Sequence, residues 1–177
     1  MANQQLITVL SLLLLLPLAF TSVAAGHVEY LPLETNIDVA VEGTVYCQSC
    51  DHHGTWSLTK AEPIPAANVS IICKDHKNRV SFYKVSTTDK SGYFYEILKG
   101  FTMKHYILDH PLHGCTVHPV SSPLANCRLV TNINYGLDGA SFRYEDKRLF
   151  GTNYEAVVYT AGPLAFRPAH CPPKIHY

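Results

Sequence analysis

The chain has 177 residues, and its 14 basic side chains balance its 14 acidic ones, so the formal net charge is zero at pH 7. This composition lacks the basic excess that is typical of proteins that bind nucleic acids or anionic membranes. We therefore expect neither a nucleic acid nor a membrane as a partner.

The first 25 residues, MANQQLITVLSLLLLLPLAFTSVAA, indicate a secretory signal peptide. The apolar run from Leu6 to Phe20 is too short, and too interrupted by proline, to span a membrane. Small residues at Val23 and Ala25 have the spacing that signal peptidase needs, which predicts cleavage before Gly26. We expect a protein released into the extracellular space, where its six cysteines favour disulfides over free thiols.

After a short extension at residues 26–36, the sequence predicts a single β domain over residues 37–177. In IDVAVEGTVYC, from Ile37 to Cys47, apolar residues alternate with polar ones, as in a half-buried strand. Similar patterns recur at residues 68–74, 79–85, 92–98, 127–131, 140–145 and 154–160. No stretch has a convincing helical period. The pattern predicts an all-β fold, a small disulfide-stapled antiparallel barrel or sandwich of about seven strands with Greek-key-like connections.

The segment TTDKSGYF contains the signals of a tight turn. The side chain of Asp89 can hydrogen-bond the backbone at the first turn position, and Gly92 suits the last. This predicts a hairpin tip.

The segment NVSIICK carries a glycosylation sequon at its first residue. Alternation along a strand places Val69, Ile71 and Cys73 toward the core. It places Asn68 and Ser70 toward solvent. We expect Asn68 to carry an N-linked glycan; the alternative is a sequon left bare because its strand folds first.

The segment VYCQSCDHH holds Cys47 and Cys50, followed by His52 and His53. A thioredoxin-type redox pair requires a helix directly after the motif, and DHHGTWSL has no helical period. A zinc site could take both cysteines and one histidine, but structural zinc needs four well-spaced ligands, and the other cysteines would remain unpaired. The pattern favours a third interpretation, in which Cys47 and Cys50 each form a disulfide with a distant partner.

A second histidine group surrounds HPLHGC and comprises His105, His110, His113 and His118. Imidazole titrates close to physiological pH, so such a group could bind a metal or respond to extracellular pH. The pattern favours the simpler interpretation of solvated loop residues that share no site.

No catalytic constellation is recognisable in the sequence. GAS at residues 139–141 lacks the flanking pattern of a nucleophilic serine elbow, so we expect no enzyme activity, no catalytic or metal-binding residue and no cofactor. Trp56 and the 11 tyrosines could provide flat surfaces on which sugar rings stack. Tyrosine is ordinary in β-sheets, so Trp56 is the residue singled out as a glycan contact.

Five segments, in their order along the chain, resemble the plant pollen Ole e 1 and extensin family: VEGTVYCQSC, PIPAANVSIICKD, TTDKSGYFYEIL, SSPLANC and GPLAFRPAHCP. The likeness covers residues 38–173. The C-terminal segments are especially similar to the PAC domain, a cysteine-containing module of some proline-rich arabinogalactan proteins. The family is known for secreted, often glycosylated β-barrel domains of plant cell walls and pollen surfaces.

The resemblance also implies a disulfide pairing, because all six family cysteines have counterparts in this sequence. The implied pairs are Cys47 with Cys127, Cys50 with Cys171, and Cys73 with Cys115. Under this pairing, the two cysteines of VYCQSC are structural and have different partners.

The resemblance implies a non-enzymatic secreted protein of the plant cell wall. We expect its domain to bind wall polysaccharide, either pectic galactan or arabinogalactan, and so to help organise the wall during growth. One alternative is a protein-recognition or signalling module of pollen or root tissue, with an extracellular protein as its partner. Another is a metal- or pH-responsive protein that uses the histidines from His105 to His118.

Overall fold

The computed structural model describes residues 37–105, 107–152 and 154–172. The predicted signal peptide and the extension at residues 26–36 lie outside the described residues. From Ile37 onward, the described residues fall within one compact unit. Within them, no helix has both the length and the apolar character needed to cross a membrane.

Strands are the main secondary structure of the described residues, and the helical elements are single short turns. The strands are β1 (Ile37–Cys47), β2 (Glu62–Pro63), β3 (Asn68–Lys74), β4 (Val80–Thr87), β5 (Tyr93–Ile97), β6 (Cys115–Ser121), β7 (Leu129–Val130), β8 (Ala140–Ser141), β9 (Arg143–Gly151), β10 (Tyr154–Thr160) and β11 (Leu164–Arg167). The helical turns are the 3₁₀ helices η1 (Cys50–His52) and η2 (Ile133–Tyr135) and the α-helix α2 (Pro111–Gly114).

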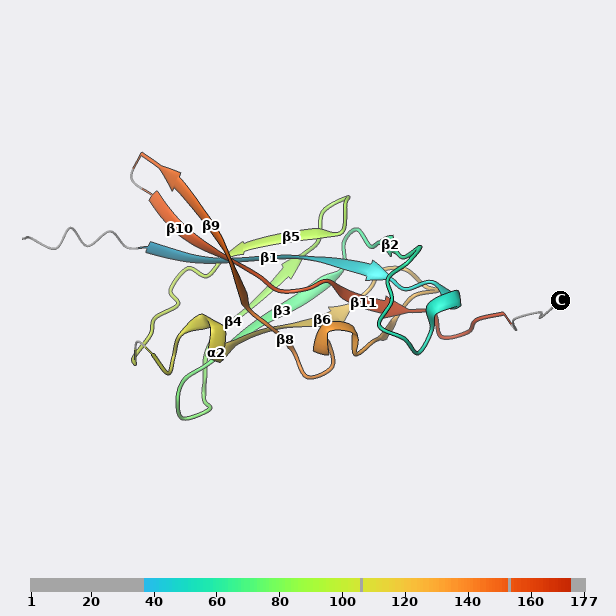
Figure 1. The fold of residues 1–177 in the computed structure, drawn as a ribbon, viewed down its shortest axis with the longest axis horizontal. Coiled ribbons are helices and arrows are strands. Elements are labelled where there is room, and N and C mark those ends of the chain that lie inside the picture. The colour runs from blue at the N-terminus through green and yellow to red at the C-terminus, as the bar shows by residue number, and fades with distance from the viewer. Residues whose placement is uncertain (1–36, 106, 153, 173–177) are drawn as a thin grey trace, which may run out of the picture. The chain divides into compact units, whose positions relative to one another are not determined.

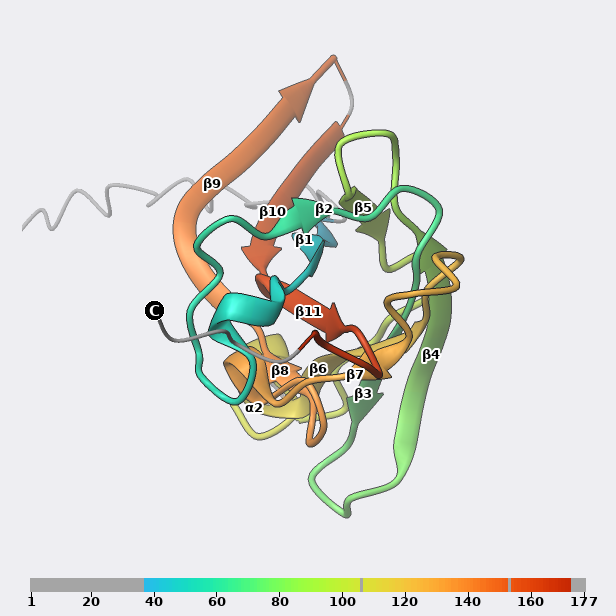
Figure 2. The same cartoon turned by 90° about the vertical axis from the view of Figure 1, so that its right-hand side faces the viewer.

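The strands form two sheets that pack as layers. The larger sheet has the order β7-β11-β1-β10-β9, with β2 and β5 also paired to β1, and the smaller has the order β4-β3-β6-β8. Figure 1 shows β1, β5 and β11 in one layer and β3, β4 and β6 in the other, and Figure 2 shows the same two layers along the strands. The predicted all-β, disulfide-stapled fold is confirmed, and it has the sandwich form.

Strand β1 organises the larger sheet because it is long enough to pair with four other strands. Its first half pairs in parallel with β10 and antiparallel with β5, and its second half pairs in parallel with β11 and antiparallel with β2. The predicted fold was antiparallel throughout. Alternation determines which face a residue occupies and carries no information on strand direction, so the two parallel pairs could not be inferred from it.

The core lies between the two layers. From the larger sheet it takes Val41, Val45, Phe94, Leu164 and Phe166, and from the smaller sheet Val69, Ile71, Cys73, Cys115 and Val117. The predicted inward set on β3, Val69, Ile71 and Cys73, is confirmed, because all three side chains are fully buried. Gly43 allows this packing, since a Cβ atom there would collide with the carbonyl oxygen of Ala161 and the ring of Phe94.

The predicted turn at Asp89 forms, but it does not join paired strands. Gly92 N donates to Asp89 O at 3.1 Å, and Asp89 Oδ1 accepts from the amides of Ser91 and Tyr93. However, β4 pairs with β3 in the smaller sheet, whereas β5 pairs with β1 in the larger one. The hairpin prediction was therefore wrong: the same turn chemistry here carries the chain from one layer to the other.

Strand β6 was absent from the predicted elements. It contains Pro119, which argues against a strand because proline cannot donate to a ladder. In the structure Pro119 lies opposite Val69, where the β3–β6 register shifts. On its other side, β6 pairs with β8 only through Thr116 and Val117. The backbone N–H that Pro119 lacks is therefore not needed in that ladder.

Candidate functional site

An open pocket of about 300 Å³ lies at the end of the sandwich where β1 and β11 end. Its walls come from the loop after β1, the segment from β7 to η2, and the last residue of β11. Figure 1 shows the loop and η1, drawn in teal, beside the end of β11. We call this hollow the aromatic pocket, and its functional side chains are Trp56 and Arg167, together with the neighbouring Tyr135.

The loop that carries Trp56 is held from inside by Gln48. The side chain of Gln48 is 1% exposed. Its Nε2 atom lies 2.9 Å from the carbonyl oxygens of His52 and Thr55 and 3.0 Å from that of Ser57. An amide nitrogen has two hydrogens, so the three acceptors share them. One buried amide therefore satisfies the inward-facing carbonyls of a loop that has no regular secondary structure beyond η1.

Two aromatic rings meet at the rim of the aromatic pocket. Trp56 is 58% exposed and Tyr135 is 59% exposed. Their ring centroids are 5.2 Å apart at an interplanar angle of 87°, an edge-to-face arrangement that aromatic pairs favour. Each ring therefore helps to orient the other while the pair remains accessible to a ligand.

Tyr135 is presented by a strained but well-anchored turn. Asn134 and Tyr135 both have positive φ, at 51° and 60°, which side-chain-bearing residues rarely adopt. The turn is fixed to β11 because Thr131 donates through N and Oγ1 to the carbonyl oxygen of Ala165. Ile133 supplies a buried apolar anchor. Such backbone strain persists where the surroundings enforce it, and it often occurs at binding sites.

The wall of the aromatic pocket carries a guanidinium and an imidazole. Arg167 and His53 line it, and among its described lining residues there is no aspartate or glutamate. The Arg167 guanidinium donates to the carbonyl oxygen of Pro168 at 3.4 Å. No ion pair joins Arg167 to a carboxylate of the described residues. An oxygen-rich or anionic ligand would find a donor here without breaking an internal ion pair.

Two disulfides join segments that border the aromatic pocket, and a third lies in the smaller sheet. The pairs are Cys47–Cys127, Cys50–Cys171 and Cys73–Cys115, with Cα–Cα distances of 6.1, 5.5 and 4.0 Å. These are the pairs that the family resemblance implies. The first two begin on either side of Gln48, so they tie the start of the Trp56 loop to the segment before β7 and to the chain beyond β11.

Asn68 lies at the first position of β3 and is partly exposed. Its Nδ2 atom donates to Ser121 Oγ at 3.0 Å, and its Oδ1 atom accepts from Thr87 Oγ1 at 2.9 Å. Ser70, which was expected to face solvent with Asn68, is instead buried. The reason is that β3 is an interior strand, so Ser70 is flanked by β4 and β6 on both sides.

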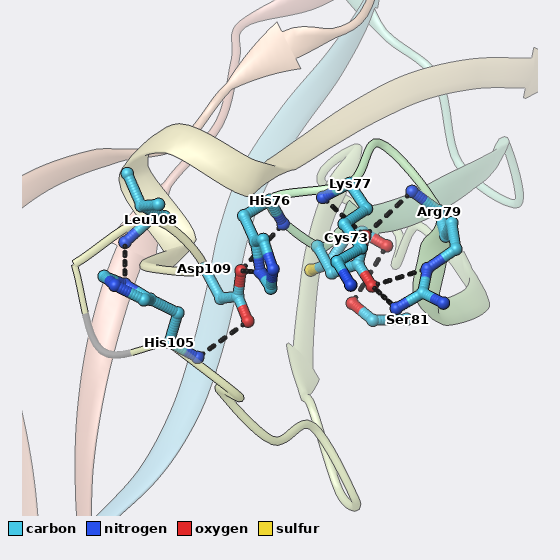
Figure 3. A network of polar contacts seen from close by, with 9 residues as sticks. Cys73, His76, Lys77, Arg79, Ser81, His105, Leu108 and Asp109 are labelled. Atoms are coloured by element: carbon cyan, nitrogen blue, oxygen red, sulfur yellow. Dashed lines mark hydrogen bonds and ion pairs between the residues drawn. The ribbon is translucent and has the colours of Figure 1, made fainter.

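The predicted histidine group is divided among different environments. Figure 3 shows Asp109 between His76 and His105. Asp109 Oδ1 accepts from the amide of His76 and lies 3.0 Å from its Nδ1, and Oδ2 accepts from the amide of His105. Burial acts to raise the pKa of the Asp109 carboxyl, but these hydrogen bonds outweigh it and hold that pKa below its usual value.

His105 and His113 are exposed, as predicted for solvated loop residues, whereas His110 and His118 are partly buried. His110 caps α2 by accepting from the amide of Leu112, and His118 lies on β6 with Nε2 3.1 Å from Thr116 Oγ1. Burial lowers the pKa of both imidazoles. His118 and His113 share an open depression with His76, a residue that the sequence analysis had not grouped with them. Across the described residues, no three His, Cys, Asp or Glu side chains are arranged to hold a metal ion.

Sequence reasoning identified Trp56 and missed Gln48, Tyr135 and Arg167. Gln48 could have been suspected because it lies between two cysteines, where a loop must be closed. NINYGLDG, which contains Tyr135, has the Asn and Gly content of a turn that presents an aromatic side chain. Nothing local marks Arg167, because its role depends on the parallel pairing of β11 with β1.

Curated plant proteins resemble this chain over most of its length. Non-classical arabinogalactan protein 30 of Arabidopsis thaliana is 35% identical over 138 residues, which are 76% of this chain and 54% of that protein. Pistil-specific extensin-like protein of Nicotiana tabacum is 35% identical over 99 residues, 56% of this chain and 21% of that protein. Proline-rich protein 1 of Arabidopsis thaliana is 32% identical over 143 residues, 76% of this chain and 37% of that protein.

The fold also has a counterpart among solved structures. The crystal structure of the major plantain pollen allergen Pla l 1 superimposes with a TM-score of 0.50 at 21% identity, covering 78% of this chain and 99% of that one. No family model matches the chain. The chain spans about half, or less, of the length of the curated relatives that it matches.

Proposed function

We propose that this chain is a protein of the plant cell wall or pollen that binds wall polysaccharide through the aromatic pocket. The proposal is supported by its homology to plant arabinogalactan, extensin-like and proline-rich proteins and by its fold, which is that of a pollen allergen. The proposed ligands are galactan or arabinogalactan chains outside the cell. In this proposal the domain is non-enzymatic and contributes to wall organisation by binding.

The exposed pair of Trp56 and Tyr135 is the observation that carries the proposal. A sugar ring has an apolar face of C–H groups, which packs on an aromatic surface, and a polar edge, which needs hydrogen-bond partners. The aromatic pocket offers both, because Asn132, Thr131 and Arg167 line its wall next to the rings. Its loops are held by Gln48 and two disulfides, so little ordering entropy is lost when a ligand binds.

The test is binding of the oxidised protein to an array of plant wall glycans, followed by calorimetry on the best ligand. Trp56→Ala should weaken binding by about tenfold to thirtyfold, as for other aromatic binding hot spots. Tyr83→Ala is the matched control, because Tyr83 is 60% exposed on β4 in the smaller sheet. If no glycan binds, or if both variants bind like the wild type, the proposal is wrong.

A second candidate function, protein recognition, is favoured by the strand pair β9 and β10. Every residue of β9 is exposed, and its outer edge is unpaired among the described strands. Phe150 is 74% exposed near the tip of this pair. An exposed edge can accept an extended segment of another protein. Phe150→Asp should abolish capture of such a partner and leave glycan binding unchanged.

We also propose that Asn68 carries an N-linked glycan. Its side chain is partly exposed, and its bonds to Thr87 and Ser121 are on the surface of the sheet. Treatment of the secreted protein with an N-glycosidase should lower its mass and convert Asn68 to aspartate. A mass that the enzyme leaves unchanged, and that differs from the mass of an Asn68→Gln variant by only one methylene, would contradict this proposal.

A further inference from the structure

Arg167, unlike Arg79 and Arg148, has no acidic partner among the described residues. Arg79 pairs with Asp75 at 2.6 Å, and Arg148 pairs with Glu155 at 2.8 Å. These paired groups fix turns and strand edges. Arg167 instead lines the aromatic pocket at the end of β11, where its guanidinium donates to the backbone carbonyl oxygen of Pro168 at 3.4 Å.

The environment of Arg167 would strengthen its interaction with an anion. Arg167 is partly buried, so its guanidinium is less screened by water than a fully exposed one. His53 lines the same pocket, and no described lining residue is acidic. The acidic side chain of the nearby loop, Asp51, is paired with Lys60 at 3.5 Å. A ligand carboxylate would therefore meet donors without meeting a like charge on the pocket wall.

The combination of an aromatic face and an unpaired guanidinium identifies one class of sugar. A uronic acid has a pyranose ring that can stack on Trp56 and a planar carboxylate that matches the two-pronged geometry of an arginine. We propose that the aromatic pocket selects an acidic sugar residue, a uronate, within or at the end of the polysaccharide, with Arg167 binding its carboxylate. This rests on the proposed function and deepens it, because a neutral galactan would offer Arg167 no carboxylate to pair with.

The test compares sugars that differ only in charge. Linear α-1,4-trigalacturonate is titrated against the same trisaccharide as its methyl ester, with neutral β-1,4-galactotetraose as a third ligand. A galactobiose carrying a terminal glucuronate distinguishes a terminal uronate from an internal one. Poly-glutamate supplies an anion without a sugar ring. Binding is measured by calorimetry at low and at physiological salt, because screening should weaken only the ionic contribution.

Variants isolate Arg167 from general effects of charge. Arg167→Gln should lower affinity for the acidic trisaccharide by about tenfold or more, the size expected for a lost charge-assisted hydrogen bond. Its effect on galactotetraose should be clearly smaller, because a neutral sugar offers Arg167 only uncharged acceptors. Lys90→Gln removes the same charge from an exposed turn residue and should change neither. Arg167→Lys keeps the charge but loses the two-pronged geometry, so it should bind with intermediate affinity.

The outcomes distinguish uronate selection from the broader proposal of polysaccharide binding. Preference for the acid over its ester, lost in Arg167→Gln, supports uronate selection. Equal binding of acid, ester and galactotetraose, all sensitive to Trp56→Ala, overturns uronate selection and keeps polysaccharide binding. Binding of poly-glutamate as strong as that of the acidic trisaccharide overturns the sugar assignment. Failure of every sugar to bind overturns both proposals.

Discussion

The aromatic pocket and the carboxylate network of Figure 3 use their polar groups in opposite ways. In the network, each buried acid is satisfied from within the chain: Asp75 by Arg79, and Asp109 by His76 and His105. In the aromatic pocket, the buried amide of Gln48 is satisfied from within, but the aromatic rings and Arg167 face outward.

Polar groups that hold the fold can therefore be distinguished from polar groups that a ligand could contact. A hydrogen-bonded carboxylate at a turn fixes the backbone, and binding a ligand there would require breaking existing bonds. In the aromatic pocket, the structural polar group, Gln48, is buried, whereas Trp56 and Arg167 line the surface that a ligand could contact. A histidine-rich sequence drew attention to the first region, although the second has the features of a binding site.

Removing one disulfide near the aromatic pocket, or one in the smaller sheet near the carboxylate network, should give the largest changes in stability. The two variants test the contrast between these regions. Cys50→Ser with Cys171→Ser opens a loop of 121 residues, and Cys73→Ser with Cys115→Ser opens one of 42. The chain-entropy model predicts that the free energy of unfolding of each double variant is lower than that of the wild type by about 4 to 5 kcal/mol. Guanidinium unfolding measures this loss for both double variants.

The two double variants should differ in ligand binding. When assayed under conditions where both are folded, only the variant lacking Cys50–Cys171 should lose affinity for glycans, because that disulfide begins in the loop that carries Trp56. The Cys73–Cys115 bridge joins β3 to β6 in the smaller sheet. Equal loss of binding in both would show that the aromatic pocket depends on global stability and that the comparison does not hold.

Gln48→Leu should have the next largest effect. It removes the donor shared by three loop carbonyls, which should cost about 2 kcal/mol of unfolding free energy. Because the loop would then lose its preferred conformation, glycan affinity should fall as well. Ser86→Ala, at a buried polar position on β4, is the control and should leave binding unchanged. A Gln48→Leu variant that binds normally would contradict the role given to this amide.

The carboxylate network should instead govern the pH dependence of stability. The side-chain and backbone hydrogen bonds of Arg79 hold the pKa of Asp75 well below its usual 3.8, and the pKa of Asp109 is also lowered. A depressed folded-state pKa stabilises the protein above the ordinary pKa, and this stability is lost as pH falls through the lower value. Asp109→Asn should therefore lower Tm at pH 7, and the difference from wild type should shrink as pH falls below the ordinary value of 3.8 and through the lowered pKa of Asp109.

Differential scanning calorimetry across this pH range measures the effect. Glu145→Gln, on fully exposed β9, is the control and should follow the wild-type curve. Glycan affinity at pH 7 should be the same for Asp109→Asn and wild type, because Asp109 does not line the aromatic pocket. A pH-independent Tm difference would mean that the carboxylate contributes through packing alone.

The sequence predicted those parts of the fold that depend on local pattern. Strands β3 and β10 have the bounds that alternation indicated, at residues 68–74 and 154–160. Strand direction, the change of layer after Asp89, and β6 with its Pro119 depend on pairing between distant segments, which alternation does not encode. Of the site, an isolated tryptophan in a polar loop could be singled out, but Gln48 and Arg167 acquire their roles only when β1 and β11 lie side by side.

The smallest expected effect concerns the contact between the two rings of the aromatic pocket. A double-mutant cycle with Trp56→Ala, Tyr135→Ala and both together should give a coupling of about 0.5 to 1.5 kcal/mol in unfolding free energy, the range for edge-to-face pairs. Each single variant should be only slightly destabilised, since both side chains are largely exposed. A measurable coupling would mean that the rings are oriented before a ligand arrives. A coupling of zero would mean that Gln48 and the left-handed turn at Asn134 do all the positioning, and then Tyr135→Ala should reduce glycan affinity without affecting how Trp56 is held.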